Sequence, residues 1–125
     1  MLYKSLDRLP SFLAGDATRF IEVLHPKNDS VDIGFSLGHA SLSAGEQSLP
    51  HVLDACSETY YILEGQGRVI INKQATEVKK NDLVYIPAGA RQYMINTGVG
   101  ILRFLCIVEP AWYAEQERIE GADKE

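Results

Sequence analysis

Short runs of apolar and β-branched residues, separated by turns rich in glycine, asparagine and aspartate, constrain the fold of this sequence more than any other feature. Apolar and polar residues alternate in several of these runs, as they do in a strand with one buried face. The expected strands lie at residues 18–24, 31–42, 68–72, 76–79, 83–86, 92–96 and 101–108, with two more inside 45–67. This pattern predicts an all-β fold made of a closed antiparallel double sheet.

Helical pieces are expected only at the two ends of the chain. Residues 5–14 place leucine and phenylalanine on one side of a short helix whose length Pro10 limits. Residues 111–119 have a helix-forming composition, and the polar tail 121–125 is expected to fray. The sequence contains no internal repeat and no second domain, so residues 1–125 are interpreted as one domain.

Composition narrows the classes of partner. The net charge of −5 and a pI near 5.2 argue against a nucleic-acid partner, which would select a basic face. No apolar run is long enough for a membrane span, and the residues MLYKSLDRLP do not resemble a secretory signal. Two cysteines far apart in sequence fit a reducing compartment. These features predict a cytoplasmic protein whose partner is a small molecule.

The stretch from Gly45 to Gly67 carries the most chemistry. Period-two geometry places residues 51 and 53 on one face of an extended segment and residues 58, 60 and 62 on one face of the next. His51 and Glu58 can therefore converge across the turn between them. Imidazole and carboxylate suit a first-row transition metal, which makes a metal site one interpretation. The alternative is a surface histidine and a salt-bridged glutamate.

This stretch resembles the first motif of the cupin family, which reads glycine, five residues, His-x-His, three or four residues, glutamate, six residues, glycine. Gly45, His51, Glu58 and Gly65 fall in register with that motif. Leu53 stands at the position of its second histidine. One of the imidazole ligands of the family is therefore missing.

Residues 81–96, NDLVYIPAGARQYMIN, resemble the second cupin motif. Pro87, Gly89 and Asn96 match it, and Asn81 replaces its leading glycine with a residue that tolerates the same left-handed turn. Gln92 replaces its histidine. The segments FLAGDATRFIEVLHPKND and FLCIVEPAW also resemble small stand-alone prokaryotic cupins, so the chain is identified as similar to a single-domain cupin of the conserved-barrel type.

The resemblance implies a jelly-roll barrel with a pocket in its mouth. His51, Glu58 and Gln92 would be the metal ligands there, holding a divalent iron, manganese, nickel or zinc ion. Tyr60 and Met94 would line the same pocket. Small cupins are commonly dimers, so the resemblance also implies a homodimer.

Several other residues have two interpretations. His39, in the expected strand 31–42, is either a further metal ligand that replaces a missing imidazole or a hydrogen-bonded histidine of the wall. Arg103 points to solvent, pairs with an acid or contacts an anionic substrate. Cys106 is expected in the core, whereas Cys56 is expected to contact the pocket or to be open to oxidation. Trp112 and the apolar strands are candidates for a dimer face.

Two functions remain open at this point. In the first, a metal held by His51, Glu58 and Gln92 polarises an oxygen of a sugar or organic acid while Tyr60 acts as a catalytic proton donor or acceptor, in isomerisation or oxygen insertion. In the second, a barrel that has lost its metal site binds a small polar ligand without catalysis, which the replacements at Leu53 and Gln92 favour. A purely structural role is the third interpretation.

Overall fold

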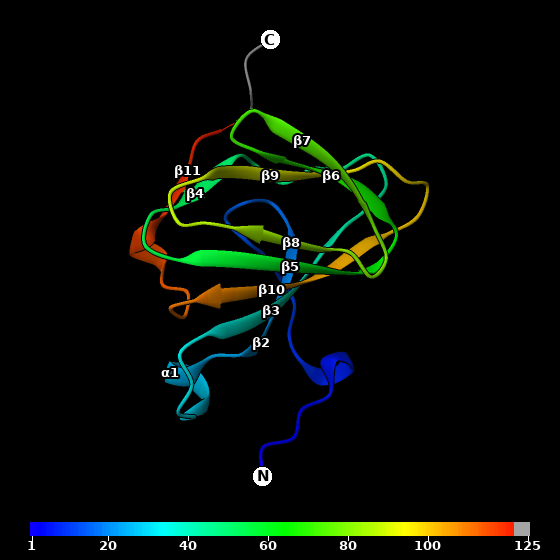
Figure 1. Cartoon of the computed structure of the whole chain (residues 1–125). Coiled ribbons are helices and arrows are strands. Elements are labelled where there is room, and N and C mark those ends of the chain that lie inside the picture. Colours follow the sequence, from blue (N-terminus) through cyan, green and yellow to red (C-terminus); the bar gives the residue numbers. More distant parts are fainter. Residues whose placement is uncertain (122–125) are drawn as a thin grey trace.

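The computed structural model describes residues 1–121 and contains two antiparallel β-sheets that face each other (Figure 1). The six-stranded sheet contains, in spatial order, β1 (Phe12–Leu13), β2 (Arg19–Leu24), β3 (Ser36–Leu42), β10 (Leu102–Glu109), β5 (Ser57–Glu64) and β8 (Leu83–Ile86). The five-stranded sheet contains β11 (Glu117–Ile119), β4 (His51–Leu53), β9 (Arg91–Asn96), β6 (Gln66–Ile71) and β7 (Gln74–Lys79). The prediction of an all-β antiparallel double sheet is confirmed.

The two sheets do not close into a continuous barrel, which corrects the prediction of a closed double sheet. The six-stranded sheet ends at β1 and β8, and the five-stranded sheet ends at β11 and β7. Two of these edge strands are very short, with two residues in β1 and three in β11. Short edges expose few unpaired backbone groups, so β1 and β11 offer little backbone for pairing with another chain.

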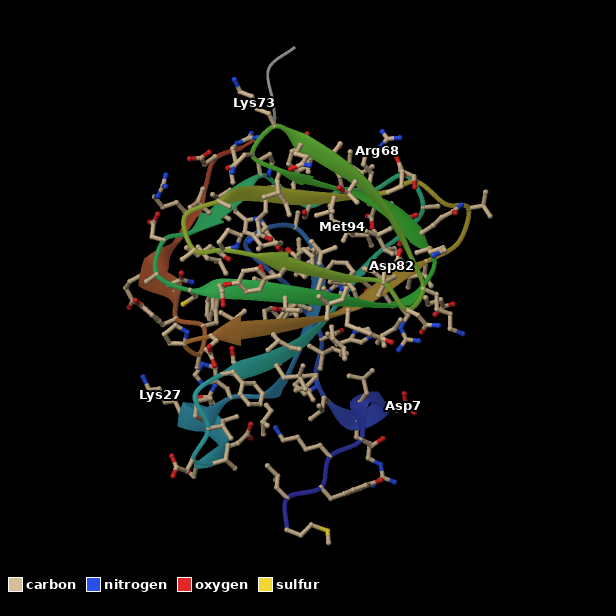
Figure 2. The ribbon with its side chains drawn as sticks, viewed as in Figure 1. Asp7, Lys27, Arg68, Lys73, Asp82 and Met94 are labelled. Carbon is tan, nitrogen blue, oxygen red and sulfur yellow. The ribbon has the colours of Figure 1, made fainter. Side chains whose placement is uncertain are left out.

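The core forms where the alternating strands turn their apolar faces toward each other. In β10, Leu102, Phe104 and Cys106 are buried, and the residues between them are only half-buried. Ile62 of β5 and Met94 of β9 are fully buried between the sheets, and Figure 2 shows Met94 inside the sandwich. Period-two alternation therefore places one face of each strand in the core, as the sequence indicates.

The N-terminal segment differs from its predicted helix. Only Leu6–Arg8 form a 3-10 turn, η1, whereas Phe12–Leu13 pair with β2 as strand β1. The ring of Phe12 lies 5.7 Å, between centroids, from the ring of Phe20 on β2. This cross-strand contact lies outside the reach of local periodicity, which is why the segment was predicted to be helical.

The C-terminal segment also differs from its predicted helix. Only Ala114–Gln116 form a 3-10 turn, η2, and Glu117–Ile119 continue as strand β11. Strand β11 pairs with β4, with Glu117 opposite Leu53. Helix propensity is a weak preference that tertiary pairing overrides here. The pairing carries Glu117 to the wall that also holds His51.

The remaining strands follow the sequence closely. The strands expected at 18–24, 83–86 and 101–108 are present as β2, β8 and β10. The strand expected at 31–42 begins only at Ser36, after a short helix, α1 (Pro26–Asp29), where the sequence predicts a turn. Within residues 1–121 no helix has the length and apolar character needed to cross a membrane. The tail expected to fray lies, beyond Gly121, outside the described residues.

Candidate functional site

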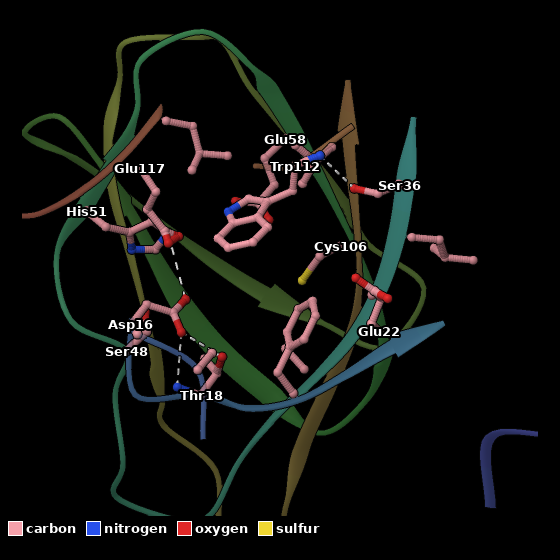
Figure 3. Close-up of a pocket in the computed structure, with 18 of the residues that line it drawn as sticks. Asp16, Thr18, Glu22, Ser36, Ser48, His51, Glu58, Cys106, Trp112 and Glu117 are labelled. Carbon is pink, nitrogen blue, oxygen red and sulfur yellow. Dashed lines mark hydrogen bonds and ion pairs between the residues drawn. The ribbon is translucent and has the colours of Figure 1, made fainter. Parts of the chain in front are cut away.

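A cavity of about 160 Å³ lies between the two sheets (Figure 3). Both sheets and three loops contribute to its walls, which include Asp16, Phe20, Gly38, Ala40, Ser48, His51, Leu53, Glu58, Tyr60, Phe104, Cys106, Trp112 and Glu117. Gly38 is required for this shape, because a Cβ atom there would lie 2.0 Å from Cζ of Phe20. The absence of a side chain at Gly38 therefore leaves room for an aromatic ring of the cavity wall.

His51 is the best-defined polar group in the cavity. It is the first residue of β4, and only 2% of its surface is exposed. Its Nδ1 lies 2.8 Å from the carbonyl oxygen of Leu49. Since a carbonyl oxygen only accepts hydrogen bonds, Nδ1 carries the proton of the neutral ring. Nε2 is therefore the unprotonated nitrogen, and it lies 3.8 Å from Oδ2 of Asp16.

Asp16 reaches the cavity from the loop between β1 and β2. Its backbone carbonyl accepts a hydrogen bond from Leu49 N at 2.6 Å, which ties this loop to the segment that leads into β4. Its Oδ1 accepts from both Thr18 N and Thr18 Oγ1, at 3.1 and 2.7 Å. Oδ2 is left to face His51, so a protonated imidazole would be stabilised there.

Glu58 is a buried carboxyl on β5 whose protonation changes near neutral pH. Burial raises its pKa from 4.5 to about 7, against the opposing effect of His51. Asp16 and Glu117 raise the pKa further, and a hydrogen bond from Gln92 lowers it. At neutral pH the group is therefore divided between an acid that can donate a proton and a base that can accept one.

Tyr60 and Gln92 form a hydrogen-bond network beside Glu58. The Tyr60 hydroxyl donates to Oε1 of Gln92 and lies 3.3 Å from Oε1 of Glu58. Burial, followed by the negative charge of Glu58, raises the pKa of Tyr60 well above its usual range. The hydroxyl therefore stays protonated, and its single proton is donated to Gln92, while the hydroxyl oxygen lies within reach of Glu58.

Asp16 and Glu117 line the cavity but were not predicted from the sequence, because distant segments supply them. Glu117 lies in a segment that reads as a helix, and burial raises its pKa while His51 opposes that shift. Trp112, expected on a dimer face, lines the cavity, and its backbone N–H donates to Ser36 Oγ at 3.0 Å. No motif singles out Asp16 or Glu117. The predicted homodimer stays a prediction.

The other expected site residues are placed as follows. Met94 packs in the core and is absent from the cavity wall, which corrects its predicted place in the pocket. Cys106 is buried in the core, as expected, and also lines the cavity, whereas Cys56 is buried against Leu53 and Val108 and is absent from the cavity wall. Burial raises the pKa of both thiols, so neither has the low pKa of a reactive cysteine.

His39 lies apart from this site. Its neighbours in β3, Gly38 and Ala40, line the cavity, so His39 projects to the opposite face of the sheet. There its Nε2 accepts a hydrogen bond from Nε of Arg103 at 3.1 Å, and Arg103 also pairs with Glu64 at 3.3 Å. The interpretations of His39 as a wall histidine and of Arg103 as the partner of an acid describe this arrangement.

The side chains present do not fit a resident metal ion. Leu53 has no donor atom, and Oε1 of Gln92 already accepts the hydroxyl of Tyr60. Across residues 1–121 no three histidine, cysteine, aspartate or glutamate side chains are grouped so that they could hold an ion. A metal-binding role for His51, Glu58, Gln92 and His39 stays a prediction, and the chemistry of the cavity is derived from its side chains alone.

Comparison with known proteins gives a family and a fold. A family model described as "Cupin domain" matches residues 38–108. An uncharacterized protein of Methanocaldococcus jannaschii is 33% identical over 113 residues, which is 90% of each chain.

Two solved structures illustrate the likeness in fold. A Streptomyces Pac13 variant with uridine has a TM-score of 0.78 at 21% identity, covering 99% of this chain and 94% of that one. Pac13 is described as a nucleoside dehydratase. A predicted oxalate decarboxylase from Thermotoga maritima has a TM-score of 0.76 at 20% identity, covering 88% of this chain and 99% of that one. Both likenesses establish the fold alone.

Proposed function

The chain belongs to the cupin family, and from this premise we propose that its cavity is an acid–base site that binds a small polar molecule and transfers protons on it without a metal. The two proposed catalytic groups are His51 as the base and Glu58 as the acid. Both line one cavity, and each is at least 90% buried.

The observation that carries the proposal is the orientation of the His51 ring. The hydrogen bond from Nδ1 to Leu49 fixes the tautomer, so the lone pair of Nε2 is presented to the cavity. After Nε2 takes a proton from a ligand, the Asp16 carboxylate 3.8 Å away favours the charged ring. Asp16 thus stands beside the same nitrogen that takes the proton, and the backbone carbonyl of Leu49 orients the ring from its other nitrogen.

Glu58 supplies the complementary acid. With a pKa of about 7, a large fraction of this carboxyl holds its proton at neutral pH. Tyr60 and Gln92 hold the carboxyl in place from one side, and the cavity lies on the other. A ligand between His51 and Glu58 would lose a proton to the first and gain one from the second.

Reactions that need this pair are isomerisations next to a carbonyl group and eliminations of water. In the first, a carbon loses a proton while a carbonyl oxygen gains one; in the second, the departing hydroxyl gains one. The likeness in fold to Pac13, described as a nucleoside dehydratase, is compatible with the second class. The volume of about 160 Å³ suits a molecule roughly the size of benzene with a short side chain.

The proposal is tested by following hydrogen–deuterium exchange on carbon. Protein treated with a chelator is incubated in heavy water with aminoacetone, glucosamine, dihydroxyacetone and glycolaldehyde. Loss of the proton signals next to the carbonyl group is then measured by NMR. We expect accelerated exchange for at least one compound and a loss of about 100-fold or more in His51→Gln.

The matched control is His39→Gln, which makes the same substitution on the outer face of the six-stranded sheet, away from the cavity, and should keep the exchange rate. Exchange that survives in His51→Gln, or that disappears on chelation, would contradict the proposal. Binding without exchange would favour the second candidate function, a non-catalytic metal-free barrel, to which the replacements at Leu53 and Gln92 also point.

A gain-of-function variant tests the metal question separately. Leu53→His combined with Gln92→His would place two imidazoles at the positions where the cupin motifs have histidine, beside His51 and Glu58. We expect this double variant to retain near-stoichiometric nickel or zinc in elemental mass spectrometry, with little metal in the wild type. Stoichiometric metal in the wild type, lost in His51→Gln, would show that the native residues suffice.

A further inference from the structure

The charges that line the cavity are unbalanced. Four carboxylates face it, from Asp16, Glu22, Glu58 and Glu117, and no lysine or arginine is among the lining residues, all of which lie in the described part of the chain. Figure 3 shows Asp16 and Glu117 beside His51, with Glu22 on a different wall. The negative groups therefore lie in a cavity that contains at most a histidine charge.

Neutral groups, rather than cations, are the hydrogen-bond donors to these carboxylates. The donor and acceptor pairs are Thr18 with Asp16, Asn28 with Glu22, Gln92 with Glu58, and Trp112 with Glu117. Several carboxylates elsewhere on the molecule have cationic partners. Arg118, for example, lies 2.9 Å from Asp54, and Arg68 lies 2.6 Å from Glu77. The cavity carboxylates differ from these exposed ion pairs in being buried beside neutral donors.

The two lining histidines do not cancel this deficit. Nε2 of His25 lies 2.8 Å from the Trp112 carbonyl and so donates to it, while Nδ1 accepts from Lys27 N at 3.2 Å. This pattern uses the neutral form of the ring. Only His51 remains, and one imidazolium would balance one of the three carboxylates that are left when Glu58 holds its proton.

A second observation marks where a ligand would lie. His51 is 98% buried, and its Nε2, 3.8 Å from Asp16 Oδ2, is beyond hydrogen-bonding distance of that carboxylate while it lines the cavity. Asp16 Oδ2 likewise faces the cavity, because Thr18 occupies Oδ1. These neighbouring atoms are both acceptors. A matching ligand must therefore offer donors, and an ammonium group offers three donors and no acceptor.

The remaining walls suit an organic cation rather than a bare ion. Phe20, Tyr60, Phe104 and Trp112 line the cavity, and the rings of Tyr60 and Phe104 meet edge to face with centroids 4.9 Å apart. Aromatic faces attract cations and also cover apolar carbon.

We propose that the ligand of this cavity is a small organic amine in its protonated form, with the ammonium group held by Asp16 and Glu117 on the wall that carries His51 and the carbon skeleton against the aromatic rings. This inference rests on the proposed function only in taking the cavity as the ligand site. It excludes anionic ligands such as organic acids and phosphate esters, because the same carboxylates repel them.

The test uses probes that differ only in charge. Tyramine, tyrosol and 4-hydroxyphenylacetate form one matched set of cation, neutral alcohol and anion, and glucosamine, glucose and glucuronate form another. Their dissociation constants are measured by calorimetry and NMR at pH 7.5. In at least one set we expect the amine to bind about tenfold or more tightly than the alcohol, with no measurable binding of the acid.

Two variants locate the effect. Glu117→Gln should reduce the preference for the amine about tenfold while leaving the affinity for the neutral probe unchanged, which also shows that the cavity is intact. Asp16→Asn should act in the same direction and serves as the second variant if Glu117→Gln folds poorly. The control is Glu77→Gln, whose side chain is 64% exposed and paired with Arg68, and it should bind like the wild type.

Three outcomes would overturn the inference: an acid that binds as tightly as its amine, no binding of either amine at about 10 mM, or a preference that persists in both cavity variants. A divalent ion that displaces the amine stoichiometrically would overturn it as well. Preference for the amine without hydrogen–deuterium exchange would support this inference and contradict the proposed proton transfer. Exchange without a charge preference would support the proposed proton transfer and contradict this inference.

Discussion

Two buried histidines differ in the charges that surround them. His39 lies on the outer face of the six-stranded sheet, whereas His51 lies in the cavity between the two sheets. On the outer face of the six-stranded sheet, His39 accepts a hydrogen bond from Arg103, which pairs in turn with Glu64. In the cavity, His51 faces Asp16 at 3.8 Å with its Nε2 open to the interior. The exposed fractions are similar, 5% and 2%. The first group is matched by its partners, whereas the second lies among unmatched carboxylates.

This contrast separates a structural histidine from a functional one better than burial does. Burial followed by the charge of Arg103 lowers the pKa of His39, so the ring stays neutral and contributes one hydrogen bond. In the cavity, burial raises the pKa of Glu58 to about 7 even though His51 opposes the shift. A group held away from its ordinary protonation state in a cavity is a candidate for chemistry.

The largest expected effect is on the pH dependence of stability, and it comes from Glu58. Its pKa is raised from 4.5 to about 7, so between these values the native protein binds more protons than the unfolded chain, and stability falls as the pH rises. The full shift corresponds to roughly 3 kcal/mol. We therefore expect the wild type to lose roughly this amount relative to Glu58→Gln across that window, as urea denaturation at a series of pH values measures.

The control for this measurement is Glu64→Gln on the outer face, whose side chain is 53% exposed and paired with Arg103. It should follow the wild-type curve. Parallel curves for the wild type and Glu58→Gln would break the comparison, because Glu58 would then titrate like a solvent-exposed carboxyl.

Much of the fold follows from local pattern. Strand β8 has the bounds that the sequence predicts, Leu83–Ile86, because alternation and flanking turns are local signals. The prediction of helices in the two terminal segments was wrong, because pairing with other strands determines their structure. Strand β11 exists because Glu117–Ile119 pair with β4, more than sixty residues earlier in the chain, and local composition does not encode that pairing.

The candidate site divides in the same way. His51, Glu58 and Tyr60 were predicted together because they occupy alternate positions in adjacent strands, and all three line the cavity. Asp16 was not predicted, because it arrives through a backbone hydrogen bond to Leu49 from a distant loop. Side-chain type alone also cannot tell which histidine faces inward; the parity of β3 settles that for His39.

A smaller effect on stability is expected from Tyr60, which packs in the core and also lines the cavity. In Tyr60→Phe, Oε1 of Gln92 loses its donor in a position where the residue is 1% exposed. A buried acceptor left without a partner costs about 1–3 kcal/mol, which urea denaturation would detect. Tyr61→Phe, adjacent in sequence but on the opposite face of β5, should change stability by no more than about 0.5 kcal/mol. Equal effects of the two substitutions would show that the network does not stabilise the cavity.

The smallest effect is expected on the outer face, in Arg103→Met. The ion pair with Glu64 is half-exposed, so its loss should cost about 1 kcal/mol or less.

The substitution also removes the charge that, after burial, lowers the pKa of His39, so that pKa should rise in an NMR titration of the ring nitrogens. A lowered histidine pKa makes the native protein lose stability as the pH falls, and this acid sensitivity should shrink in the variant. Arg68→Met, which breaks a surface pair with Glu77, should leave the His39 titration unchanged. If Arg103→Met leaves it unchanged as well, the charge of Arg103 does not govern His39, and the outer face would no longer serve as the matched counterpart of the cavity.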